Sequence, residues 1–259
     1  MTTERSFPKV TVVVPTYNER DNLPRLVGRL TALRLPDLHV LVVDDNSPDG
    51  TGDVADKLAL ESPEAVAVLH RTDKDGLGRA YIVGITRALD EGADIVIQMD
   101  ADLSHPAEAV PAMVDALSST DAAAVIGSRY VPGGSVATEW PWRRRALSAW
   151  ANLYVNAILR LKVKDATAGF KAWRAETLRK IDVHSIRSNG YSFQVEMNHR
   201  TVSQGMRIAE IPIRFEERSA GISKIGLAVQ IESALMPWKL LFDRRGDGTG
   251  RRWWPATWR

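Results

Sequence analysis

Two carboxylates stand one residue apart at the point where an apolar run of the sequence ends. Residues 95–99 form the run, and Asp100 and Asp102 follow it. Side chains alternate in direction along a strand, but the chain can curl beyond the last ladder hydrogen bond, and both carboxylates can then reach one hard cation. Oxygen ligands of this kind suit Mg²⁺ or Mn²⁺, which usually accompany a phosphorylated substrate. The alternative is a helix N-cap plus an exposed loop acid, because Pro106 is well placed to open a helix.

The elements that would position these carboxylates alternate along the first half of the chain. Short apolar runs predict strands at residues 10–14, 39–43, 65–69, 95–99 and 123–126. Segments between them, at residues 23–33, 54–58, 81–89 and 106–117, keep helical spacing. Such alternation is typical of an α/β fold with a doubly wound, mostly parallel sheet and helices on both faces.

Polar residues follow four of these predicted strands. In a parallel sheet the carboxyl ends of the strands share one edge, so these residues should converge on a ligand site. Gly76 and Gly78 begin like a dinucleotide fingerprint, but Tyr81 occupies the third glycine position, which favours a phosphate-approach or helix-start role over NAD. The polar strand ends are residues 15–19, 44–45, 100–102 and 127–129.

Composition excludes several kinds of site. The 259 residues include no cysteine, so disulfides and thiolate metal sites are excluded and a reducing compartment fits. The five histidines show no ligand spacing and no Gly-x-Ser-x-Gly occurs, so zinc and serine chemistry have little support. No N-terminal segment resembles a signal peptide, and no uncharged stretch reaches the ~20 residues that span a bilayer. We therefore expect a protein that is soluble or peripheral on a membrane.

The second half begins with a Gly- and Pro-rich stretch and then a predicted helix that Arg143–Arg145 open. Three positive charges at a helix N-terminus oppose the macrodipole, which makes sense if they meet an anion, although a solvated charge run is commoner. Residues 218–224 predict a small loop, with a cation at each end, that could close over a phosphate. The remaining predictions are a helix at 190–206, a strand at 207–215 and an amphipathic helix at 227–242. The helix that the three arginines open has the apolar stripe Leu147, Trp150, Tyr154, Ile158 and Leu161.

Charge and tryptophan are concentrated toward the C-terminus. Residues 219–259 carry seven Lys or Arg against three Asp or Glu, and all eight tryptophans lie at or after position 140. A basic, Trp-rich segment is typical of a membrane-surface contact. We expect Trp150 and Trp173 to be core residues, and we divide the chain into a catalytic domain, 1–242, and a basic tail, 243–259. The alternative is that the last helix packs on the domain and the tail is a linker.

Six motifs occur in a fixed order and together resemble a known family. They are Pro-Thr-Tyr-Asn-Glu (15–19), Asp-Asp-x-Ser-Pro-Asp-Gly-Thr (44–51), Gly-Leu-Gly (76–78), Asp-Ala-Asp-Leu-Ser-His-Pro (100–106), Gly-Ser-Arg-Tyr (127–130) and the Arg…Ser-Lys loop (218–224). Over residues 9–242 the chain resembles the inverting family 2 glycosyltransferases of the GT-A fold. Within them it is similar to the polyprenyl-phosphate (dolichyl-phosphate) mannose synthases.

The resemblance implies roles for individual residues. Some relatives carry a metal-binding Gln where this chain has Ser104, which leaves the coordination of the cation open. The expected nucleoside-binding residues are Pro15, Tyr17, Glu19, Val43 and Asp45. The expected metal and diphosphate residues are Asp100, Ala101 and Asp102, with Arg129, Arg218 and Lys224 as substrate-binding cations. Asp100, Asp102, Arg129 and Lys224 are the expected catalytic set, and Arg129, Arg144 and Ser148 the expected acceptor-phosphate set.

The resemblance also implies an activity, which is mannose transfer from GDP-mannose to a polyprenyl monophosphate with Mg²⁺ or Mn²⁺. The Gln-x-x-Arg-Trp motif of processive enzymes is absent, so a single transfer is expected. Some relatives carry transmembrane helices after the catalytic domain. This chain resembles the soluble type, so we expect it on the cytoplasmic face of a membrane, with a separate or fused membrane partner and no nucleic acid.

Three alternatives remain open from the sequence. One is glucosyl transfer from UDP-glucose, because the nucleoside motifs alone fix neither base nor sugar. Another is a non-catalytic sugar-nucleotide-binding subunit, which the intact set of acidic and basic residues disfavours. A phosphohydrolase is the third, but that chemistry normally places Asp-x-Asp after the first strand, and here it follows the fourth.

Overall fold

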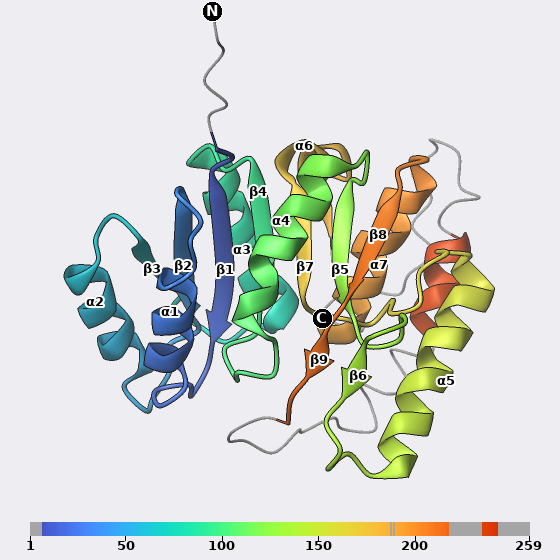
Figure 1. Cartoon of the computed structure of the whole chain (residues 1–259), viewed down its shortest axis with the longest axis horizontal. Helices are drawn as coiled ribbons and strands as arrows, with labels where there is room; N and C mark the ends of the chain where they lie inside the picture. Colours follow the sequence, from blue (N-terminus) through green and yellow to red (C-terminus); the bar gives the residue numbers. More distant parts are fainter. Residues whose placement is uncertain (1–6, 187, 189, 218–234, 243–259) are drawn as a thin grey trace, which may run out of the picture.

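A seven-stranded sheet forms the centre of the computed structural model, which describes residues 7–186, 188, 190–217 and 235–242 (Figure 1). The strand order is β3-β2-β1-β4-β7-β5-β8, and all neighbours are parallel except β7, which is antiparallel to both β4 and β5. The fold class expected from the sequence is therefore confirmed. The strands are β1 (Val10–Thr16), β2 (Leu38–Asp44), β3 (Val66–His70), β4 (Ile95–Gln98), β5 (Ala124–Ser128), β7 (Lys171–Arg174) and β8 (Ile208–Pro212).

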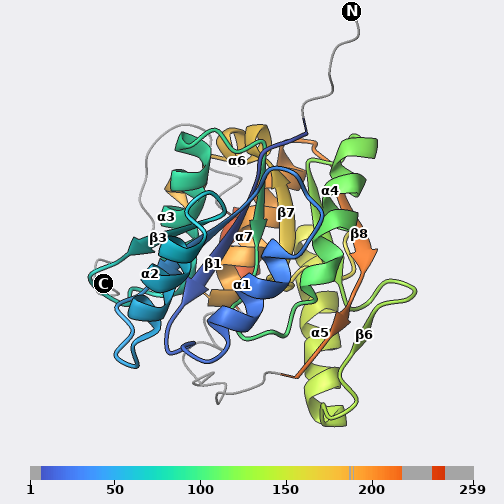
Figure 2. The ribbon, with the colours of Figure 1, turned by 60° about the vertical axis from the view of Figure 1, so that its left-hand side comes forward.

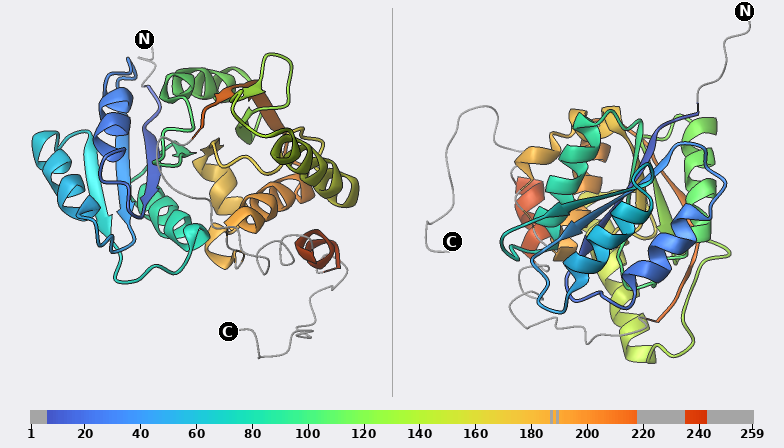
Figure 3. Two further views of the ribbon diagram at one scale, coloured as in Figure 1. Left: turned by 90° about the horizontal axis from the view of Figure 1, so that it is seen from below. Right: turned by 90° about the vertical axis from the view of Figure 1, so that its left-hand side faces the viewer.

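Helices cover both faces of the sheet (Figure 3). Every residue of β1 is buried, as expected for a parallel strand with helices on both sides. One core joins the sheet to α1 (Leu23–Thr31), α2 (Thr51–Glu61) and α4 (Val110–Ser119). A second core joins the opposite face to α3 (Leu77–Asp90), α6 (Ala175–Lys180) and α7 (Gly190–Ser203).

The remaining strands and one further helix lie near β5 (Figure 1). Strands β6 (Ser135–Val136) and β9 (Arg214–Phe215) form a separate parallel pair. Helix α5 (Trp142–Leu159) extends beyond the carboxyl edge of the sheet (Figures 1 and 2). It packs through Val155 and Leu159 on a third, smaller core that includes residues of the helix at 235–242. Two 3₁₀ turns, Ala107–Ala109 and Val183–Ser185, complete the described elements.

Two expectations about the second half were wrong. Trp150 is 56% exposed rather than part of the core, whereas Trp173 is fully buried as expected. The stripe expected on α5 is displaced, because the helix buries Asn152, Val155 and Leu159 instead and leaves Leu147 in solvent. The predicted strand at 207–215 is divided into β8 and β9. Of the predicted helix at 227–242, residues 235–242 are helical and the others lie outside the described residues.

Candidate active site

The polar ends of β1, β2 and β4 meet in a pocket of about 190 Å³ at the carboxyl edge of the sheet. The structure therefore brings together most of the residues that the sequence selected. It adds Lys74 and Leu77 and leaves out Val43, whose side chain is buried in the core between β2 and α3. The lining residues are Pro15, Thr16, Tyr17, Glu19, Asp45, Lys74, Leu77, Asp100, Ala101 and Asp102.

A larger hollow of about 350 Å³ lies at the opposite, amino edge of the sheet. Pro8, Asp94 and Arg179 are among the residues that line it, and it contains none of the residues selected from the sequence. The edge at which the strands end, and not the size of the hollow, identifies the candidate site.

The two adjacent acids at the end of β2 have different environments. Asp44 accepts hydrogen bonds from the Ser47 hydroxyl (2.6 Å) and the Thr16 hydroxyl (3.1 Å), so it holds the turn after β2. Asp45 faces the pocket and pairs with Nη1 of Arg71 at 2.5 Å. Burial raises the pKa of Asp45, and the positive charge of Arg71 partly opposes that rise. Arg71 was not selected from the sequence, because only the fold brings the end of β3 beside β2.

Tyr17 and Lys74 form an exposed wall of the pocket. The Lys74 ammonium lies 3.4 Å from the centroid of the Tyr17 ring, a cation–π contact. Glu19 lines the same pocket, and its carboxylate accepts a hydrogen bond from Asn22 (2.8 Å) while its backbone N–H donates to the Thr51 hydroxyl (2.9 Å). These contacts fix the loop after β1 against the start of α2.

The carboxylates of Asp100 and Asp102 are oriented by neighbours. The Tyr81 hydroxyl donates to Asp100 Oδ1 at 2.9 Å, and the Asp100 backbone N–H donates to Nδ1 of His105 at 3.2 Å. The backbone N–H and hydroxyl of Ser104 both donate to Asp102 Oδ1, at 3.1 and 2.5 Å. Burial and the nearby Asp100 charge raise the pKa of Tyr81 well above its usual value, so the phenol keeps the proton that it donates.

This donor set fits a hard divalent cation. Asp100 and Asp102 supply carboxylate oxygens, and no group of three or more His, Cys, Asp or Glu side chains suited to a metal occurs in the described part of the chain. Mg²⁺ and its analogues commonly bind one or two carboxylates and take their other oxygens from water and substrate phosphates. Ser104 directs its hydroxyl proton to Asp102, so it orients the carboxylate at the position where some relatives carry Gln.

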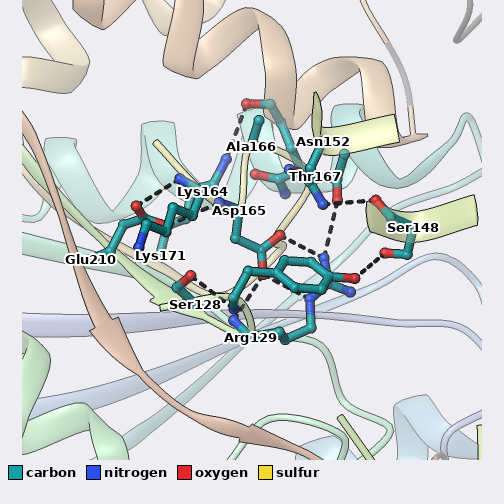
Figure 4. Close-up of polar contacts among 12 residues, drawn as sticks. Ser128, Arg129, Ser148, Asn152, Lys164, Asp165, Ala166, Thr167, Lys171 and Glu210 are labelled. Atoms are coloured by element: carbon teal, nitrogen blue, oxygen red, sulfur yellow. Dashed lines mark hydrogen bonds and ion pairs between the residues drawn. The ribbon is translucent and has the colours of Figure 1, made fainter. Parts of the chain in front are cut away.

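Arg129, at the end of β5, is held by a partner that the sequence did not reveal. Its Nε and Nη2 donate to the two oxygens of Asp165 at 2.7 and 2.6 Å, and Nη2 also donates to the Thr167 hydroxyl at 3.0 Å (Figure 4). Asp165 is fully buried and the Arg129 side chain is 10% exposed. The guanidinium also lies 5.5 Å from the Phe215 ring, which contacts His105 edge to face. Arg129 is therefore fixed beside the Asp100 loop and does not line the pocket at the ends of β1, β2 and β4.

The two expected acceptor-binding residues on α5 lie near Arg129. The Tyr130 hydroxyl donates to the Ser148 hydroxyl at 2.7 Å. Arg144 stacks on Trp140, 3.8 Å from the ring centroid, and its Nη1 lies 3.2 Å from a Glu217 carboxylate oxygen. Arg218 and Lys224, which complete the expected set of cations, lie outside the described residues.

Comparison with known proteins identifies the family of this chain. The family model described as "Glycosyl transferase family 2" matches residues 11–182, so the chain belongs to that family. It is 48% identical to the polyprenol monophosphomannose synthase of Mycolicibacterium smegmatis over 86% of this chain and 83% of that protein. It is 50% identical to the undecaprenyl-phosphate mannosyltransferase of Micrococcus luteus over 84% of this chain and 87% of that protein. These matches confirm the resemblance to polyprenyl-phosphate mannose synthases.

Among solved structures, the mannosyltransferase of Pyrobaculum calidifontis, in complex with GDP-Man and Mn²⁺, shares this fold. It superimposes with a TM-score of 0.58 at 20% identity, over 93% of this chain and 65% of that one. At that identity the likeness supports the fold alone. In the described residues of this chain, every helix is too short or too polar to cross a membrane.

Proposed function

We propose that this protein transfers mannose from GDP-mannose to a polyprenyl monophosphate and releases GDP. The observation that carries the proposal is the pocket at the carboxyl edge, where a buried acid, Asp45, and the Asp100–Asp102 pair face one cavity. A nucleotide sugar has a nucleoside at one end and a diphosphate at the other, which this arrangement suits. The two relatives described above, 48% and 50% identical in sequence, are named as a polyprenol monophosphomannose synthase and an undecaprenyl-phosphate mannosyltransferase, which supports the proposal.

The donor lies between two parts of the pocket in this proposal. Tyr17, Glu19 and Asp45 bind the nucleoside, and the cation–π pair of Tyr17 and Lys74 offers it a flat face. Asp100 and Asp102 lie at the diphosphate and would hold the Mg²⁺ or Mn²⁺. When bound, that cation supplies positive charge against the charge that develops on the departing diphosphate.

The acceptor supplies its own nucleophile. A phosphate monoester has a second pKa of about 6, so it is largely a dianion at pH 7. One of its oxygens attacks C1 of mannose, the bond from C1 to the diphosphate breaks, and the electron pair leaves with GDP. A single displacement of this kind inverts the anomeric carbon and needs no protein base. Arg129, Arg144 and Ser148 are the residues that we assign to the acceptor phosphate.

The experiment that tests the activity is incubation of the purified full chain with labelled GDP-mannose, Mg²⁺ and a polyprenyl phosphate. We expect label in the lipid phase, and none when the lipid is an unphosphorylated polyprenol. Parallel reactions replace GDP-mannose with UDP-glucose. Lipid label with UDP-glucose alone would contradict the assigned donor, and label with neither would favour the non-catalytic subunit.

The acceptor requires a membrane, and the surface around α5 suits one. Trp150 stacks on Tyr154 at 5.1 Å, the Tyr154 oxygen accepts a hydrogen bond from Trp238 at 2.9 Å, and Trp238 stacks on Phe242. This aromatic row crosses from α5 to the helix at 235–242 and lies beside the exposed Leu153. Aromatic rings of this kind favour the headgroup level of a bilayer. We propose that the row rests on a cytoplasmic membrane surface, directly or beside an integral membrane partner.

The basic tail at 243–259 lies outside the described residues, and its part in membrane binding stays a prediction. The test is co-sedimentation with anionic vesicles at ~0.15 M salt, where exposed charges are screened beyond ~8 Å. Each basic residue near an anionic surface is worth about 1 kcal/mol, so a chain cut after Arg245 should bind more weakly than the full chain. Equal binding by both would assign the contact to the aromatic row instead of the tail.

A further inference from the structure

A closed ring of contacts joins Arg129 to α5. Arg129 Nη2 donates to the Thr167 hydroxyl, and the Thr167 backbone N–H donates to Asn152 Oδ1 at 3.1 Å. Asn152 Nδ2 donates to the backbone carbonyl of Ser148 at 3.0 Å, and the Ser148 hydroxyl accepts the proton of Tyr130. Tyr130 follows Arg129 in the chain, which closes the ring.

Burial and bonds from neighbouring elements hold the ring in place. Asn152 is 3% exposed, so its amide bonds are made away from water, where an unmade bond is costly. The segment at 164–167 is also held by β8 and α7, because Glu210 accepts the backbone N–H groups of Lys164 and Asp165 and the Asn198 amide donates to Ala166. Thr167 is therefore a fixed point to which both Arg129 and α5 are attached.

We propose that Thr167 and Asn152 are positioning residues that set the distance between the Arg129 guanidinium and α5, and so shape the site for the acceptor phosphate. The proposal rests on the function proposed above, because Arg129, Arg144 and Ser148 are assigned there to that phosphate. A tetrahedral dianion needs donors at fixed spacing, and a group misplaced by about 1 Å can cost a large factor in rate. Neither Thr167 nor Asn152 carries charge or lines the donor pocket, so their effect should fall on the acceptor and not on the nucleotide sugar.

The test compares variants that differ by one contact. Thr167→Val keeps the shape of the side chain and removes the hydroxyl that Arg129 reaches, whereas Thr167→Ser keeps that hydroxyl. Asn152→Leu breaks the same ring from the helix side. Asn156→Ala is the control, because Asn156 lies one turn further along α5, donates its side-chain amide to the backbone carbonyl of Asn152, and lies outside the ring.

The readouts are the KM for a short polyprenyl phosphate, the KM for GDP-mannose, kcat and the melting temperature. We expect Thr167→Val and Asn152→Leu to raise the acceptor KM about tenfold, equivalent to ~1.4 kcal/mol, with little change in the donor KM. Thr167→Ser should restore acceptor binding, and Asn156→Ala should leave the acceptor KM close to that of the wild type.

Two results would overturn the inference. One is that Thr167→Val lowers kcat or the melting temperature but leaves the acceptor KM unchanged, which would make the ring a purely structural support. The other is that Asn156→Ala raises the acceptor KM as much as Asn152→Leu does. In either case transfer by the wild type would leave the proposed function standing, whereas no transfer by the wild type would overturn both.

Discussion

Two regions of this protein are built in different ways: the pocket that we assign to the nucleotide sugar, called the donor side, and the region around Arg129 that we assign to the acceptor, called the acceptor side. On the donor side, Asp45, Asp100 and Asp102 lie within four residues of the ends of β2 and β4, and the sheet brings them to one edge. On the acceptor side, Arg129 also follows a strand, but its orientation depends on Asp165 and Thr167, which come from a segment with no regular structure. Strand ends give the donor side its position, and buried polar bonds give the acceptor side its shape. Changes on the donor side should therefore act on chemistry, and changes on the acceptor side should act on both stability and chemistry.

The largest expected effect on activity is at the donor carboxylates. Asp102→Ala should lower kcat by a factor of order 10²–10³ or more, because it removes a preorganised group at the diphosphate, and Asp100→Ala should be nearly as severe. The melting temperature should change little. Asp115→Ala, an exposed acid on α4, is the control. Near-normal, EDTA-resistant transfer by either variant would show that the two acids only cap a loop and take no part in the chemistry.

On the acceptor side, Asp165→Ala should destabilise the fold as well as lower activity. It leaves the Arg129 guanidinium buried without its carboxylate, and breaking a buried ion pair in this way costs about 3–5 kcal/mol. Urea unfolding measures the loss. Asp121→Ala breaks the exposed pair with Arg207 near the start of β8 and should change the free energy of unfolding much less, because solvent screens exposed pairs. Equal losses in the two variants would show that the acceptor side does not depend on its buried pair.

A smaller effect is expected from Tyr81, which orients a carboxylate without facing the substrate. Tyr81→Phe removes the hydrogen bond to Asp100 and keeps the ring that stacks on Phe193. Loss of such an orienting bond typically costs 10–100-fold in metal affinity or activity. Titration of activity with Mn²⁺ separates a loss of metal affinity from a loss of activity at saturating metal, and Tyr154→Phe serves as the control. A variant with wild-type metal dependence would show that strand ends alone orient Asp100.

The smallest effect, taken per pH unit, is on the pH dependence of stability. Lys171 is fully buried, and burial lowers its pKa from 10.5 to about 7, although Asp165 opposes the shift. Between these two pH values the unfolded chain holds a proton that the folded chain lacks. The free energy of unfolding should therefore rise with pH across this window, by at most about 1.4 kcal/mol per pH unit.

Lys171→Met removes this contribution, so the difference in unfolding free energy between variant and wild type should change steadily from pH 7 to pH 10. Below pH 7 the difference should be constant. Lys180→Met, at an exposed position on α6, should show a difference that does not vary with pH. A flat difference for Lys171→Met would mean that the lysine keeps its charge in the folded protein.

Most of the residues that line the pocket on the donor side could be predicted from the sequence, because the residues at strand ends are adjacent in the motif and in space. Val43 was the exception, since it lies one residue inside β2 and its side chain faces the core. Arg71 and Tyr81 were missed as site residues, because each reaches the acids only through strand or helix packing. His105 was missed because its ring accepts a backbone N–H of Asp100, a contact that no motif indicates.

The acceptor side was predicted less well. Asp165 lies 36 positions from Arg129, and no periodic pattern relates them. Trp150 was assigned to the core because helical spacing gives the width of an apolar face but not which side of the helix meets the sheet. The structure shows that Asn152, a polar residue, lies on the buried side instead. Hydrophobic patterns cannot identify a helix face that is buried through hydrogen bonds.

The reversed strand β7 also determines when the acceptor side can form during synthesis. Strand β5 bonds β7 and β8 but not β4, so it is joined to the rest of the sheet only through β7. Strands β1 to β4 come from the first 98 residues, and they can pair as soon as those residues have left the ribosome. A nascent chain that stops before Lys171 has all four of those strands and the whole of β5, but it has no strand to connect them. The half that we assign to the nucleotide sugar is thus complete in sequence well before the half that we assign to the acceptor can join it.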